Sequence, residues 1–140
     1  FPTRRSSDLT SIGYFKNFKD NFLVFKSVCK ALRPGGVFVI DFFNSEKIES
    51  SLHADYIEKR GPVHFHIQKK IVNNAIQKRI EFNFEGKEYY FEESVSLLKK
   101  EDFESFAADA GLTLNRCFGN YQFDAFDKKQ SERLILIFKK

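Results

Sequence analysis

The sequence predicts an α/β protein that carries an inserted antiparallel sheet, and three changes of hydrophobic period lead to this prediction. Apolar residues recur with the helical period over residues 17–32, ahead of an almost wholly apolar segment at 37–43. The period then falls to two over residues 64–97, and helical spacing returns at 103–110 before two final strands. A helix followed by a buried strand is half of an αβ unit of a parallel sheet, so we expect the chain to open in the middle of a domain.

The first predicted helix begins at Asn17, whose side chain can cap it, and Asp20 lies near the positive end of its dipole. The turn Pro34-Gly35-Gly36 ends the helix and reverses the chain. Apolar residues lie on one helix face, which we expect to pack on a sheet: Phe18, Phe22, Phe25, Cys29 and Leu32.

The strand predicted over residues 37–43 is apolar at nearly every position, as a strand covered on both faces must be. Asp41 is the exception. An acid near the carboxyl end of a parallel strand points toward the crevice where ligands bind in open α/β sheets. A role as a helix cap or loop anchor fits the same residue equally well.

After a short helix at residues 45–52, alternating apolar residues predict an antiparallel meander of three strands with one apolar face. Breaks at Asn73-Asn74 and at Glu85-Gly86-Lys87 separate these strands. The expected inward residues include Phe65, Ile67, Ile80, Phe82, Tyr89, Phe91 and Val95.

The last predicted helix contains Phe103, Phe106, Ala107 and Ala110 at helical spacing, and Gly111 supplies the position that ends it. Residues 112–118 and 133–138 are the final two strands, joined by a polar and aromatic loop at 120–132.

Residues 1–9, FPTRRSSDL, differ in character from the sequence that follows. They resemble the translation of a common short-read sequencing adaptor, TTC CCT ACA CGA CGC TCT TCC GAT CT, in one frame. We therefore interpret this stretch as a cloning or assembly scar and leave it out of the fold prediction. A basic N-terminal tail is the alternative.

Composition narrows the class of protein. The 42% of hydrophobic residues, with 18 phenylalanines, can fill the core of one domain or part of one. The net charge of +4 is spread among nearly as many acids as bases, which gives little reason to expect nucleic-acid or membrane partners. Cys29 and Cys117 lack the spacing of a zinc site and suit two reduced, buried thiols of a cytoplasmic protein. No apolar run is long enough for an export signal or a membrane span.

Several of these segments together resemble the later half of a class I S-adenosylmethionine-dependent methyltransferase. They are the loop TSIGYF at residues 10–15, the turn at 32–36, the strand containing Asp41, and the helix, strand and terminal strand of residues 94–140. The resemblance covers residues 10–140 and implies the later strands of a Rossmann-like sheet. It also implies that the terminal strand lies antiparallel between the other two, and that the sheet inserted at about 56–98 forms a wall over the substrate.

The resemblance implies S-adenosylmethionine as cofactor and a small molecule as methyl acceptor. The glycine-rich turn and the ribose-binding acid of such enzymes would lie upstream of Thr10. Gly35-Gly36 is no substitute, because it follows a helix and precedes a strand. We therefore expect that this chain alone does not bind the cofactor well.

By the same resemblance, the loop at residues 10–15 lies beside the cofactor's methionine end and the acceptor. Tyr14 is the candidate catalytic residue, orienting the acceptor through its hydroxyl or ring edge, although it could simply pack under the helix. Thr10, Ser11 and Gly13 are the candidate cofactor-binding residues.

Asp41, Glu93 and Tyr121 are the candidate substrate-binding residues, and for Tyr121 a place in a solvated loop is the alternative. Glu93 belongs to a Glu-Ser pair that relatives place near the substrate mouth, but the arginine and tyrosine that often follow are Ser96 and Leu98 here. That departure weakens the case for an acceptor carboxylate held by an arginine. The pair His64 and His66 could ligate a metal, but the sequence places no third ligand, and we predict no metal site.

The rival hypothesis is a non-catalytic α/β binding module whose aromatic-rich antiparallel sheet holds a small apolar ligand or a partner protein. A nucleic-acid variant of this module is disfavoured, because Phe65, Phe82 and Phe91 fall on the apolar face and not among clustered bases. The upstream coding sequence discriminates the two: a strand followed by a glycine-rich turn favours the enzyme.

Overall fold

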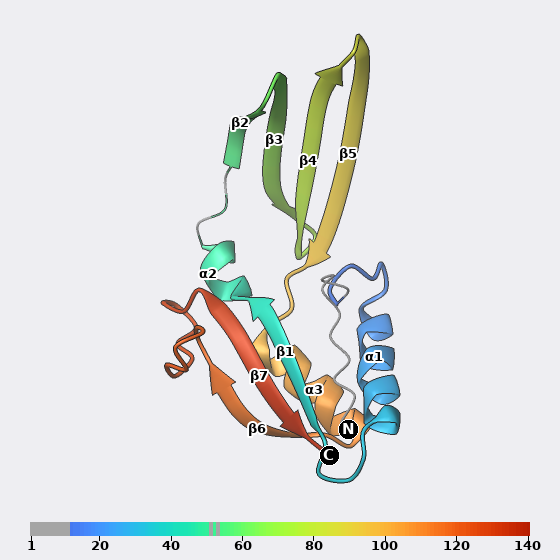
Figure 1. The fold of residues 1–140 in the computed structure, drawn as a ribbon. Coiled ribbons are helices and arrows are strands. Elements are labelled where there is room, and N and C mark those ends of the chain that lie inside the picture. The colour runs from blue at the N-terminus through green and yellow to red at the C-terminus, as the bar shows by residue number, and fades with distance from the viewer. Residues whose placement is uncertain (1–11, 51, 53) are drawn as a thin grey trace.

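The computed structural model describes residues 12–50, 52 and 54–140 and contains two antiparallel sheets (Figure 1). One sheet has three strands in the order β1-β7-β6, and the other has four in the order β2-β3-β4-β5. The helices are α1 (Phe18–Ala31), α2 (Ser45–Glu49) and α3 (Lys100–Ala110). The strands are β1 (Val37–Phe43), β2 (Ala54–Arg60), β3 (Val63–Val72), β4 (Ala75–Phe84), β5 (Lys87–Ser96), β6 (Thr113–Phe118) and β7 (Arg133–Lys139).

Helix α1 begins and ends as its sequence predicts. The Asn17 side chain accepts a hydrogen bond from the Lys19 amide at 3.1 Å, which satisfies one of the unpaired donors of the first turn. Leu32 closes the helix, and Gly35 adopts a φ of +76° in the turn that follows. Lys140, from the other end of the chain, donates from its ammonium group to the carbonyls of Cys29 and Leu32.

The three-stranded sheet has the predicted arrangement. Strand β7 lies between β1 and β6 and runs antiparallel to both, with Leu136 opposite Ile40 on one side and opposite Cys117 on the other. Most side chains of this central strand are buried, which agrees with the almost continuously apolar sequence of β7.

Helices α1 and α3 cover one face of this sheet, where the hydrophobic core lies. Alternate residues of β1 and β7 point to that face and are buried, among them Ile40, Phe42, Leu136 and Phe138. The opposite face is more open, since Val39 is 55% exposed. Gly111 ends α3 with a φ of +89°, as predicted.

The second sheet has four strands and not the three that alternation predicts. Strand β2 escaped prediction because ADYIEKR holds one adjacent apolar pair, Tyr56-Ile57, and no alternating run. It becomes a strand by pairing with β3, where Tyr56 lies opposite Ile67. The predicted breaks are confirmed: Asn73 and Asn74 have φ values of +50° and +58°, which two-residue hairpin turns require.

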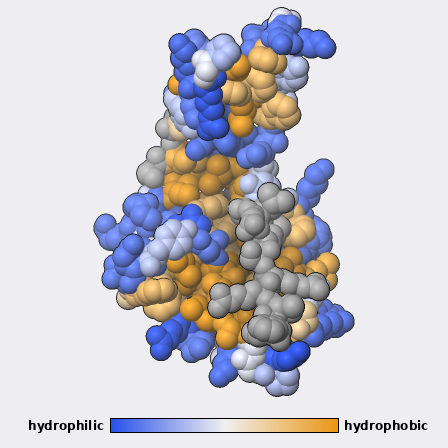
Figure 2. Space-filling model, viewed as in Figure 1, coloured by the Kyte–Doolittle hydropathy of each residue, from blue (hydrophilic) through white to orange (hydrophobic). Residues whose placement is uncertain are grey.

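One face of the four-stranded sheet is apolar and aromatic. Phe65 lies opposite Phe82, and the Phe82 ring stacks on Tyr89 with centroids 4.9 Å apart. Phe91 continues the row and remains 53% exposed. Figure 2 shows hydrophobic side chains gathered over this sheet and over the three-stranded sheet beneath it. No helix within the described residues is long and apolar enough to cross a membrane.

Candidate functional site

Polar side chains meet at the carboxyl edge of the three-stranded sheet, where β1 and β6 end and β7 begins. The Tyr121 hydroxyl, from the loop after β6, donates to Asp41 Oδ2 at 2.7 Å. Arg133, the first residue of β7, donates from Nε to Asp41 Oδ1 at 2.8 Å, and its Nη2 lies 2.8 Å from the same oxygen. The structure thus brings together two residues predicted for one pocket, Asp41 and Tyr121, and adds Arg133.

Sequence reasoning missed Arg133 because its role depends on register. In the β1–β7 ladder Arg133 lies opposite Phe43 and is therefore the diagonal neighbour of Asp41 on the same face. An alignment of the terminal strand with the strand that contains Asp41 would have placed Arg133 beside Asp41.

The electrostatics of Tyr121 follow from these contacts. Its hydrogen bond to Asp41 is the main cause that raises the pKa of the phenol, and burial adds to the effect. The positive charge of Arg133 opposes it, with the guanidinium carbon 6.0 Å from the Tyr121 ring centroid. The phenol is therefore held in its neutral form more firmly than an ordinary tyrosine.

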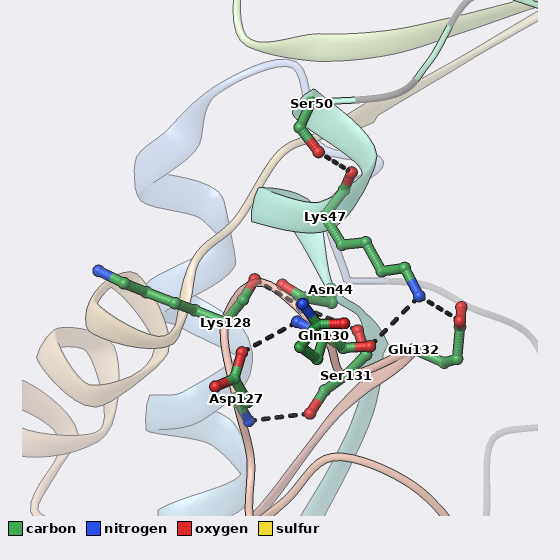
Figure 3. Close-up of polar contacts among 8 residues, drawn as sticks. All are labelled: Asn44, Lys47, Ser50, Asp127, Lys128, Gln130, Ser131 and Glu132. Atoms are coloured by element: carbon green, nitrogen blue, oxygen red, sulfur yellow. Dashed lines mark hydrogen bonds and ion pairs between the residues drawn. The ribbon is translucent and has the colours of Figure 1, made fainter.

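The far part of the loop that carries Tyr121 is fixed to α2 and its cap (Figure 3). Asn44 is almost fully buried and donates from Nδ2 to the carbonyls of Lys128 and Ser131, both at 2.9 Å. Lys47 donates to the Gln130 carbonyl at 3.2 Å and pairs with Glu132. The sequence did not predict these contacts, because no local pattern indicates that Asn44 donates hydrogen bonds to residues more than eighty positions away.

Replacing Asn44 with alanine is expected to lower the free energy of unfolding by about 1–3 kcal/mol, because two partly buried carbonyls lose their donor and a buried side chain is removed. Chemical denaturation followed by circular dichroism measures the change. The control is Ser50→Ala, which removes an exposed hydroxyl bonded to the Lys47 carbonyl and should change stability by less than about 0.5 kcal/mol. Equal losses in both variants would contradict the anchoring role of Asn44.

The loop before α1 is held from two sides at Gly13. The Gly13 amide donates to Oδ1 of the fully buried Asn21 at 3.0 Å, and Asn21 Nδ2 donates to the Phe18 carbonyl. The Gly13 carbonyl accepts from the Ser96 amide at 2.8 Å, which ties this loop to the end of β5. Tyr14 follows directly, with 44% of its surface exposed. The other predicted loop residues, Thr10 and Ser11, lie outside the described residues, as do residues 1–9.

Gly13 has a φ of +90°, and a Cβ there would lie 3.1 Å from Val95 Cγ1 and 3.3 Å from Phe42 Cζ. Gly13→Ala is therefore expected to destabilise the protein by about 1–3 kcal/mol, since backbone strain and crowding add. Gly61 is a matched control, because its φ is +57° and a Cβ at that position would meet no atom within 4 Å. Thermal unfolding should show the larger loss for Gly13→Ala, and a larger loss for Gly61→Ala would contradict the crowding.

Glu93 does not join the Asp41–Tyr121–Arg133 cluster. It is exposed on β5 of the other sheet, opposite Lys78 on β4. Strand alternation places Glu93 on the same face as Phe91 and Val95, and Val95 is the residue that packs near Gly13. Glu93 therefore lies on the sheet face that leads toward the loop of Tyr14.

The histidine pair lies on the polar face of the four-stranded sheet. His66 Nε2 lies 2.6 Å from Asp55 Oδ1, and its Nδ1 lies 3.9 Å from Glu81 Oε2. Hydrogen bonds from Gln68 and His66 lower the pKa of Asp55. Over residues 12–50, 52 and 54–140, no three histidine, cysteine or acidic side chains gather into a metal-binding group. Cys29 and Cys117 are free and half-buried, and burial raises the pKa of the Cys117 thiol.

No family model matches the chain, and no curated protein matches it significantly. Solved structures do resemble it. An S-adenosylmethionine-dependent methyltransferase from Clostridium acetobutylicum superposes with a TM-score of 0.77 and 22% identity, covering 94% of this chain and 55% of its own. The CcbJ methyltransferase from Streptomyces caelestis superposes with a TM-score of 0.73 and 15% identity, covering 93% and 57%.

A third similar structure is the sugar N-methyltransferase KedS8 from Streptoalloteichus, with a TM-score of 0.66 and 15% identity over 94% of this chain and 53% of that one. This chain therefore spans about half the length of the structures it resembles. At such identities the likeness establishes the fold, and the predicted fold class, part of a methyltransferase sheet with an inserted antiparallel sheet, is confirmed.

Proposed function

We propose that this chain is the later part of an S-adenosylmethionine-dependent methyltransferase that methylates a small molecule. The observation that carries the proposal is the position of the Asp41–Tyr121–Arg133 cluster at the carboxyl edge of a sheet with a methyltransferase fold. Ligands of open α/β sheets bind at that edge. The loop of Gly13 and Tyr14 reaches the same end of β1 from the other face of the strand, because Gly13 is bonded to the end of β5 and lies beside Phe42, the residue after Asp41.

The chain's own residues suit the acceptor side of such a site. Tyr14 would orient the acceptor, while Asp41, Tyr121 and Glu93 would contact it. Gly13, with Thr10 and Ser11, would face the cofactor's methionine end. Orientation is worth much in this chemistry, since a positioned nucleophile gains several kcal/mol over free encounter.

The described residues do not by themselves fit the whole cofactor. The Gly35-Gly36 turn lies before β1, at the opposite end of that strand from Asp41, and the Gly36 amide is already used in a hydrogen bond to the Arg33 carbonyl at 2.8 Å. It therefore offers no open backbone cradle for a nucleoside at the candidate site. In our proposal the residues that hold the adenosine precede this chain in the gene.

A binding module remains the second candidate, because the aromatic face of the four-stranded sheet is partly exposed. Tyr56, Phe84 and Phe91 each expose more than two fifths of their surface. Such a face could hold a small apolar ligand or a partner protein without any chemistry.

The test of the proposed function is an acceptor screen. The chain is expressed with the residues that precede it in its gene, and transfer of a labelled methyl group from S-adenosylmethionine is measured against small-molecule amines, hydroxyls, carbon acids and carboxylates. We expect turnover with one class of acceptor, and none by the present chain. An upstream sequence without a strand and glycine-rich turn, together with no transfer to any acceptor, would favour the binding module.

A further inference from the structure

The two carboxylate oxygens of Asp41 accept hydrogen bonds from two different side chains, Arg133 and Tyr121. Two guanidinium nitrogens of Arg133 converge on Oδ1, while Oδ2 accepts the Tyr121 hydroxyl. The three residues come from β1, from the start of β7 and from the loop after β6. When two nitrogens of a planar guanidinium bind one oxygen of a carboxylate, the orientation of the other oxygen is also fixed.

The backbone of Arg133 is held in place close to its contact with Asp41. Its backbone amide donates to the Gly119 carbonyl at 3.0 Å, at the start of the loop that carries Tyr121. In the ladder with β1 its Cα lies opposite Phe43. Arg133 therefore connects the strand that holds Asp41 with the loop that holds Tyr121.

The hydrogen-bond inventory of Tyr121 limits what its oxygen can do. A phenol has one hydrogen to donate, and here it is used on Asp41. The oxygen keeps lone pairs, and 62% of the Tyr121 surface is exposed at the candidate site. What this oxygen can still offer a ligand is a hydrogen-bond acceptor.

We propose that Arg133 is a positioning residue that acts through Asp41 to keep Tyr121 a neutral hydrogen-bond acceptor for an N–H or O–H group of the ligand. Tyr121 then orients the nucleophile but does not take its proton. The identity of the ligand as a methyl acceptor rests on the proposed function, whereas the Arg133–Asp41–Tyr121 arrangement does not. The raised pKa of Tyr121 supports the proposal, since charge alone from Arg133 would lower it.

The test separates the geometry of Arg133 from its charge. Tyrosines are labelled with ¹³C at the ring carbon that bears the oxygen, and their pKa values are measured by NMR in the full chain. The Tyr121 signal is assigned by its loss in Tyr121→Phe. We expect its pKa to lie above the ordinary value, to fall in Asp41→Asn, and to fall nearly as far in Arg133→Lys, which keeps the charge but cannot form the fork.

Tyr90 is an internal control for this titration. Its hydroxyl donates to Glu92, which raises the pKa of Tyr90, and it lies in the other sheet. An unchanged Tyr90 pKa shows that the four-stranded sheet is intact in each variant and that the change at Tyr121 is local. If Arg133→Lys leaves the Tyr121 pKa raised, or if wild-type Tyr121 titrates at or below the ordinary value, the positioning role is overturned.

A second measurement tests whether Arg133 and Tyr121 act together in methyl transfer. The titration does not depend on its result. In the longer protein, Arg133→Lys and Tyr121→Phe should reduce kcat/KM for methyl transfer by similar factors, and the double variant should lose little more than either alone. Fully additive losses would contradict action through Tyr121. Absence of methyl transfer would reject the proposed function, while the titration would still decide the role of Arg133.

Discussion

Replacing Phe25 with alanine is expected to lower the free energy of unfolding by about 3–5 kcal/mol, because a fully buried ring is lost from the core. The Phe25 ring contacts four others on both layers: Phe38 and Phe138 on the sheet, and Phe103 and Phe106 on α3. The helix–sheet packing cannot close a cavity of that size without moving α1. Urea denaturation followed by circular dichroism measures the loss.

Phe18 provides the matched control, on the same helix and also beside Phe106. Its ring centroid lies 5.0 Å from that of Phe106, but 47% of its surface is exposed. Phe18→Ala should therefore cost less than half as much as Phe25→Ala. A loss below about 1 kcal/mol for Phe25→Ala would mean that α1 does not pack on the sheet as described.

Replacing Tyr14 with alanine is expected to reduce kcat/KM for methyl transfer by about 10- to 100-fold in the longer protein, because a loosely held acceptor reacts far more slowly. Tyr14→Phe separates the two possible contributions: activity close to wild type assigns the orienting contact to the ring, and a loss like that of alanine assigns it to the hydroxyl. Steady-state kinetics with the acceptor found in the screen measure both variants.

Tyr90 is the control for this prediction, since it is a similarly exposed tyrosine on the polar face of the other sheet, opposite Glu81. Tyr90→Ala should leave kcat/KM within about twofold of wild type. A Tyr14→Ala variant that is equally active would remove Tyr14 from the candidate site and leave it as a packing residue of the loop.

The helices and the core were predictable from the sequence because their signals are local. The spacing of Phe22, Phe25 and Cys29 indicates which face of α1 packs on the core, although the predicted Phe18 remains half exposed. Asn17 and Gly111 mark helix ends through their own side chain or backbone. The central position of β7 was also predicted, but from a family resemblance, because no local property of its residues states which strands it pairs with.

The contacts that sequence reasoning missed are those set by pairing and register. Strand β2 has no alternation of its own and exists through its ladder with β3. Arg133 meets Asp41 only because β7 aligns with β1 in one register, and Asn44 meets Lys128 and Ser131 across the fold. Of the predicted site residues, Asp41 and Tyr121 come together, whereas Glu93 lies on the other sheet.

The most direct measurement is calorimetric titration of S-adenosylmethionine into two polypeptides: this chain alone, and the chain preceded by its natural upstream residues in place of residues 1–9. The account predicts saturable micromolar binding, about −8 kcal/mol, for the longer polypeptide only. Micromolar binding by this chain alone would show that the cofactor site has been misplaced. No binding by the longer polypeptide would contradict the assignment as a methyltransferase.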